Sequence, residues 1–157
     1  MVRLGWLAGL LLIGGATSTW DIPLRNTETA PTAKGTARLV YAASPFGVAV
    51  TADGVASYDV QLELSGLPAP ASLGDYRAYV AWAASIDLKD WHRLGTVRNG
   101  SSTVGQAELN KFLLVITAEA DSQAATRTGP TILHGPSPST WLQSFLSHPL
   151  FRGIPPG

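Results

Sequence analysis

Alternating apolar and polar residues predict extended strands through the middle of the chain. The clearest case is Tyr58–Ser65, which alternates over all eight residues. One side of this segment carries its apolar residues: Tyr58, Val60, Leu62 and Leu64. A period of two places one face of a strand on a core and the other in water. The segment is therefore expected to be a half-buried strand.

Further apolar segments separated by turn signals predict a run of similar strands. They span residues 36–44, 46–51, 76–84, 91–98, 103–109, 112–119 and 131–134. Segment 76–84 is apolar on nearly both faces, as in a central strand. Its alanines leave a helix as the alternative, but its tyrosines, Val80 and Trp82 favour a strand. Asn99-Gly100 predicts a tight turn, and the two prolines of segment 66–71 predict a loop.

Strands at this spacing predict an all-β fold, namely an Ig-like antiparallel β-sandwich over residues 36–135. Residues 136–157 are expected to add a short C-terminal helix and a tail, with Ser137 as the helix cap and Pro138 in its first turn. One face of that helix would carry its apolar residues: Trp141, Leu142, Phe145 and Leu146. Packing against the sandwich is the simpler interpretation of this face, and docking to a partner is the alternative.

The first twenty residues have the three parts of a secretory signal. Arg3 is the only charge before Asp21, an apolar run covers residues 4–16, and small residues follow it. The run is shorter than the roughly 20 residues of a membrane-spanning helix. Cleavage is the favoured prediction, with an uncleaved anchor or a buried core helix as alternatives. Residues 21–35 show no apolar period and are predicted to be a flexible spacer.

Composition narrows the possible functions. Eleven basic residues balance eleven acidic ones and charged residues make up only 14% of the chain, so phosphate-driven binding of nucleic acid is not expected. The chain has no cysteine, which excludes disulfides, thiolate zinc sites and cysteine nucleophiles. At 157 residues and 45% hydrophobic content it is long and apolar enough for one domain with its own core.

Catalytic and metal-binding patterns are weak. There is no G-x-S-x-G motif and no glycine-rich phosphate loop, so no enzyme and no cofactor are predicted. Asp87 and Asp90 would be the acid–base pair of an enzyme acting on envelope polymers, but two acids in a polar loop are more often simply solvated. The alternative function is envelope metal (copper) handling by His92, His134 and His148, although their spacing does not by itself bring them together.

Two loops are the candidates for contact with a partner. They span residues 68–75 and 85–91, and the second holds four candidate contact residues: Asp87, Lys89, Asp90 and Trp91. A tryptophan beside charges is a frequent contact residue, although partial burial at the start of a strand is its commoner fate. The expected partner is an unidentified envelope protein, with membrane contact only through an uncleaved N-terminal segment.

Several short motifs follow one another in an order that resembles a known family. They are Gly66-Leu67-Pro68, the aromatic segment 76–82, Leu94-Gly95-Thr96, segment 112–119 with its Thr117-Ala118-Glu119 end, and segment 128–135 beginning Thr128-Gly129-Pro130. Over roughly residues 60–135 the chain resembles the extracytoplasmic C-terminal domain of anti-sigma-K-type factors. The sequence lacks that family's sigma-binding domain and its zinc-binding histidine–cysteine motif. The resemblance therefore implies a β-sandwich outside the cytoplasm that senses or binds another molecule, not sequestration of a sigma factor.

Overall fold

A computed structural model describes residues 20–44, 47–48, 55, 57–109 and 111–138. This part of the chain is almost entirely strand and turn, and none of its helices is long and apolar enough to cross a membrane. Outside the described residues lie residues 1–19 of the predicted secretory signal, most of segment 46–51, the helix face from Trp141 to Leu146, and His148. The elements are β1 (Asp21–Asn26), β2 (Lys34–Tyr41), β3 (Ala43–Ser44), β4 (Gly47–Val48), β5 (Tyr58–Ser65), the 3-10 turn η1 (Pro70–Ser72), β6 (Ala78–Ala84), β7 (Trp91–Val97), β8 (Gly100–Ala107), β9 (Leu113–Glu119) and β10 (Thr131–Pro136).

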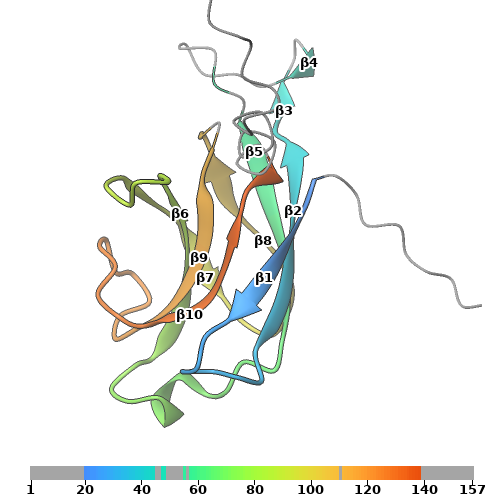
Figure 1. Cartoon of the computed structure of the whole chain (residues 1–157). Helices are drawn as coiled ribbons and strands as arrows, with labels where there is room; N and C mark the ends of the chain where they lie inside the picture. Colours follow the sequence, from blue (N-terminus) through green and yellow to red (C-terminus); the bar gives the residue numbers. More distant parts are fainter. Residues whose placement is uncertain (1–19, 45–46, 49–54, 56, 110, 139–157) are drawn as a thin grey trace, which may run out of the picture.

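Eight of these strands form one antiparallel sheet that curls into a nearly closed barrel (Figure 1). Their order is β7-β6-β9-β10-β1-β2-β5-β8, and β3 pairs with β4 in a separate small hairpin. The two end strands, β7 and β8, are consecutive in the chain and lie against each other. They approach so closely that a Cβ atom on Gly105 would lie 2.7 Å from the carbonyl oxygen of Leu94. The sheet therefore has little exposed edge between its two ends.

The all-β prediction is confirmed, and several strand predictions hold closely. Tyr58–Ser65 is a strand with the predicted bounds, and its inward side chains Val60, Leu62 and Leu64 are buried. Segment 76–84 forms a strand over residues 78–84, not a helix, and both faces of this strand, β6, are buried. Asn99 stands just before β8 in the short connection from β7, as its turn signal predicts. The Ig-like sandwich and the C-terminal helix stay predictions.

The spacer prediction for residues 21–35 is wrong, because β1 forms at Asp21–Asn26. This strand lies between β2 and β10 and pairs with β2 through its first four residues and with β10 through its last two. Ile22 and Leu24 point into the core, whereas Pro23 between them is exposed. The alternation is only five residues long and contains a proline, which is why it reads as a spacer in the sequence alone.

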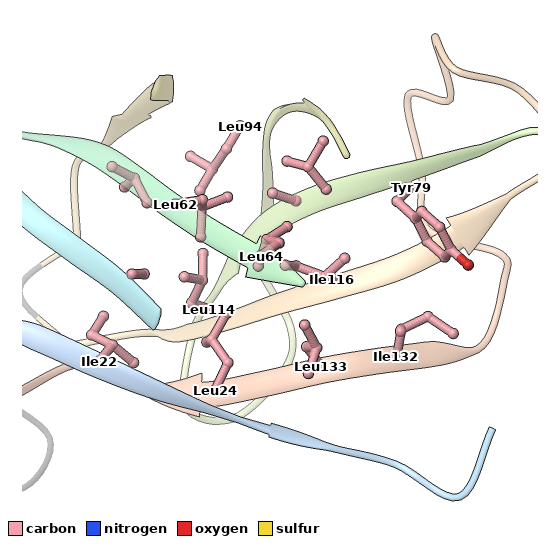
Figure 2. Close-up of a cluster of buried hydrophobic side chains, with 14 of the residues drawn as sticks. Ile22, Leu24, Leu62, Leu64, Tyr79, Leu94, Leu114, Ile116, Ile132 and Leu133 are labelled. Carbon is pink, nitrogen blue, oxygen red and sulfur yellow. The ribbon is translucent and has the colours of Figure 1, made fainter. Parts of the chain in front are cut away.

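The barrel interior is filled by aliphatic side chains from both halves of the sheet. Figure 2 shows this cluster, with Leu62 and Leu64 of β5 on one side and Ile22, Leu24, Leu114 and Ile116 of β1 and β9 on the other. These residues are at most 9% exposed. Full burial of each such side chain contributes roughly 1.5–3 kcal/mol. The core therefore holds the domain together without disulfides.

A second buried layer lies on the outer side of β6 and β9. The Trp82 indole N–H donates to Thr117 Oγ1 at 2.9 Å, and the Thr117 hydroxyl donates to Glu119 Oε1 at 2.6 Å. Glu119 is fully buried, and its other oxygen accepts from the Thr128 hydroxyl at 2.8 Å and from the Gly129 N–H at 3.1 Å. This carboxylate therefore ties the segment between β9 and β10 to the sheet.

The loop after β5 is held by the two neighbouring elements. The Tyr79 hydroxyl donates to the Pro68 carbonyl at 2.9 Å. The Asn99 side chain accepts from the Leu67 N–H and donates to the Leu67 carbonyl, both at 2.9 Å, as a strand partner would. Gly66 starts the loop at φ 68°, and a Cβ atom there would run into the Thr32 carbonyl oxygen. The Gly66-Leu67-Pro68 motif is thus an ordered loop.

Candidate partner-binding loop

The connection between β6 and β7 is a compact loop built around Ser85. Its backbone N–H donates to the Asp90 carbonyl, and its own carbonyl accepts from the Leu88 N–H, each at 2.9 Å. The Ser85 hydroxyl oxygen accepts from the N–H groups of Lys89 at 3.2 Å and Asp90 at 3.0 Å. One small side chain therefore satisfies the loop backbone from inside, as serine does in many turns.

The two charged side chains at the loop tip bind one another. Asp87 accepts from the Ser85 hydroxyl at 2.7 Å and lies 3.0 Å from the Lys89 ammonium group. The Ser85 hydrogen bond, followed by that from Lys89, lowers the pKa of Asp87 below its ordinary value. Both side chains are largely in solvent, so their ion pair adds little to the stability of the fold.

Trp91 joins this loop to the segment between β9 and β10. Its indole N–H donates to the Leu88 carbonyl at 2.9 Å, and the Arg127 guanidinium carbon lies 4.8 Å from its ring centroid. The same segment is fixed further along β7, where Arg93 donates to the Ser122 carbonyl at 2.7 Å. Trp91 is partly buried, and its side chain is used in contacts within the domain.

Two aliphatic side chains project from this ordered loop into solvent. Ile86 is 49% exposed and Leu88 is 51% exposed. Leu88 has a φ of 58° and is the only described residue other than glycine with a positive φ. Left-handed backbone is unfavourable for a branched side chain, and it persists only where the surroundings impose it. The hydrogen bonds around Ser85 and Trp91 impose it here.

The four residues predicted for partner contact are thus neighbours on one loop, but their contacts within the domain differ. Asp87 and Lys89 pair with each other, Asp90 supplies backbone bonds, and Trp91 buttresses the loop. The most exposed apolar groups of the loop are Ile86 and Leu88, which are not among the four residues predicted for partner contact. The signal was present, because both are apolar residues inside an otherwise polar segment.

The other predicted loop, residues 68–75, borders a shallow concavity of about 630 Å³. Its lining includes Asp75, Tyr76 and Arg77, and Asp121 from the segment after β9. Among the described residues that line this concavity, no buried side-chain polar atom lacks a hydrogen-bond partner. The loop therefore offers fewer features of a binding site than residues 85–91 do.

The histidines within the described residues are far apart. His92 lies on β7 and His134 on β10, with β6 and β9 between them. At about 4.8 Å per strand this separates their backbones by roughly 14 Å. The described part of the chain contains no group of three or more His, Asp or Glu side chains that could hold a metal ion.

Comparisons with family models, with curated proteins and with solved structures find no match to this chain.

Proposed function

We propose that the chain is an exported, non-catalytic β-domain that binds another envelope protein through the loop of residues 85–91. The observation that carries this proposal is the exposure of Ile86 and Leu88 on a loop whose backbone is held by several internal hydrogen bonds. A rigid loop loses little conformational freedom on binding, so apolar groups on it contribute efficiently to affinity.

The strain at Leu88 supports the same conclusion. An asparagine or glycine at this position would relieve the left-handed backbone and remove an exposed aliphatic group at once. Leucine is unfavourable here for both reasons. Unfavourable backbone conformations concentrate where a side chain has to be presented for a function.

The location and the finer fold also belong to this proposal. The secretory pattern of residues 1–20 supports a place outside the cytoplasm. The resemblance to the anti-sigma-K extracytoplasmic domain agrees with such a location and with an Ig-like sandwich. Two of the motifs that carry it, Thr117-Ala118-Glu119 and Thr128-Gly129, meet in one hydrogen-bonded unit, so these motifs are explained by folding.

The test is site-specific photo-crosslinking in the producing cell. A photoreactive amino acid replaces Ile86 in one variant and Gln123, an exposed residue of the segment after β9, in the control. We expect one discrete adduct from position 86 and none from position 123. The crosslinked protein is then identified, purified, and its affinity measured with wild-type chain and with Leu88→Asn.

Leu88→Asn keeps a residue that tolerates a positive φ while removing the aliphatic contact. We expect it to fold normally and to weaken binding by about tenfold or more, as expected for a central apolar contact. Equal affinity of Leu88→Asn and wild type, or identical adducts from positions 86 and 123, would show that this loop is not the contact.

A further inference from the structure

We propose that the domain also seats directly on a lipid bilayer, through an aromatic cluster of Trp20, Tyr41 and Tyr58. The three rings meet at one end of the barrel, with centroid separations of 5.4 Å for Trp20–Tyr41, 5.9 Å for Trp20–Tyr58 and 5.1 Å for Tyr41–Tyr58. Burial, followed by the hydrogen bond with Tyr41, raises the pKa of Tyr58 above its ordinary value.

The cluster leaves much of its surface uncovered within the described residues. Trp20 is 39% exposed, Tyr41 is 44% exposed, and the adjacent Val40 is 38% exposed. These side chains come from the start of β1 and the end of β2, and Tyr58 from the start of β5. Rings with an apolar body and a polar tip, exposed beside an aliphatic residue, are the groups that favour the headgroup level of a bilayer.

The large exposed apolar side chains of the described residues all lie at this same end. Antiparallel pairing around the sheet puts the start of β1, the end of β2, the start of β5 and the β6–β7 connection together at one end of the barrel (Figure 1). Ile86 and Leu88 therefore share it with the aromatic cluster. The opposite end, with the β1–β2 loop and η1, shows no large exposed apolar side chain among the described residues.

The sequence next to the cluster favours lipid as the occupant. The apolar run of residues 4–16 precedes Trp20 by only three residues. In the uncleaved alternative, insertion of that run into a bilayer brings the cluster to the membrane surface. Two cations at this end are paired, Arg38 with Asp21 at 2.8 Å and Lys89 with Asp87 at 3.0 Å, and the chain as a whole has no net formal charge. We therefore expect binding to the bilayer to depend mainly on apolar burial and to change little with salt or with anionic lipid.

This inference goes beyond the proposed function and is independent of it. If both hold, the loop of residues 85–91 lies near the plane of the membrane, and its protein partner is met there.

The absence of cysteine allows a clean test by single-cysteine labelling. Val40→Cys and, at the opposite end, Ala71→Cys are made in the full chain and labelled with an environment-sensitive fluorophore. Each is added to phosphatidylcholine vesicles in which a fraction of the lipid carries a doxyl quencher near its headgroup. We expect the label at 40 to be quenched about twofold and the label at 71 to be nearly unaffected, at low and at high salt.

A second variant distinguishes contact of the aromatic cluster with lipid from simple attachment through the apolar run of residues 4–16. Trp20→Ser with Tyr41→Ser in the Val40→Cys chain keeps the apolar run, and we expect it to lose most of the quenching. Tyr76→Ser, an aromatic change at the opposite end, should leave quenching intact. The proposal is overturned if the label at 40 is not quenched by lipid. It is equally overturned if that label is shielded from iodide without lipid quenching, since a second copy or another segment of protein would then cover the cluster.

Discussion

Replacing Glu119 by alanine should reveal how much of the fold depends on one buried carboxylate. Glu119 is fully buried and accepts four hydrogen bonds of 3.2 Å or less, from the Thr117 and Thr128 hydroxyls and from the N–H groups of Thr128 and Gly129. The hydroxyls can turn to other acceptors, but the buried Gly129 N–H cannot. An unsatisfied buried donor costs about 1–3 kcal/mol, and each lost hydrogen bond to a charged group a further 1.5–3.

The gain from no longer burying a charge offsets part of this loss. We therefore expect Glu119→Ala to lower the free energy of unfolding by roughly 3 kcal/mol, a large share of the 5–15 kcal/mol typical of a domain. Glu119→Gln keeps one acceptor oxygen and should cost about half as much. Because Thr128 and Gly129 lose their anchor, their amides should also exchange faster with solvent than those of the barrel core.

The assay is urea unfolding followed by circular dichroism, with hydrogen exchange as the local readout. Glu28→Ala, an exposed glutamate in the β1–β2 loop, is the matched control and should stay within about 0.5 kcal/mol of wild type. If Glu119→Ala does not fold, Glu119→Gln carries the measurement. A loss no larger than that of the Glu28 control in both variants would show that the Glu119 carboxylate does not stabilise the fold.

Three further predictions concern the loops. Tyr79→Phe removes the hydrogen bond to Pro68 and should lower the free energy of unfolding by about 1 kcal/mol. Because burial raises the pKa of Tyr79, the stabilisation by its neutral hydroxyl is complete below the ordinary tyrosine pKa and is lost as pH rises through the raised value. Alkaline unfolding of the wild type and of Tyr79→Phe would show this difference. The carboxyl of Asp87, followed by NMR, should titrate below its ordinary value and move toward it in Ser85→Ala, so the loop tip loosens only as pH falls through the lowered pKa; an unchanged midpoint would contradict the assigned hydrogen bond. Gly66→Ala combines backbone strain with a clash against Thr32 and should destabilise more, in a thermal melt, than Gly100→Ala, where φ is 104° but no atom lies within 4 Å of the new Cβ; equal losses would mean that the clash is relieved.

The candidate site was only partly predictable. The loop itself follows from its polar residues between two apolar strands, and Asp87, Lys89, Asp90 and Trp91 are indeed neighbours on it. Which of these side chains is already used in contacts within the domain depends on hydrogen bonds across the turn and on the contact of Trp91 with Arg127, a residue far along the chain. The aromatic cluster is harder still, because Trp20, Tyr41 and Tyr58 meet only once β1, β2 and β5 are in register.

Local alternation and turn signals were enough to predict most of the strands and turns, although not β1. Period two in Tyr58–Ser65 and the Asn99-Gly100 turn act within a few residues, so they need no distant partner to be recognised. Tertiary structure alone decided that Asp21–Asn26 completes the sheet, that Glu119 is buried, and that the exposed apolar groups gather at one end. The physical reason is the same in each case: the stabilising contacts come from residues far away in the chain, and only the closed sheet brings them together.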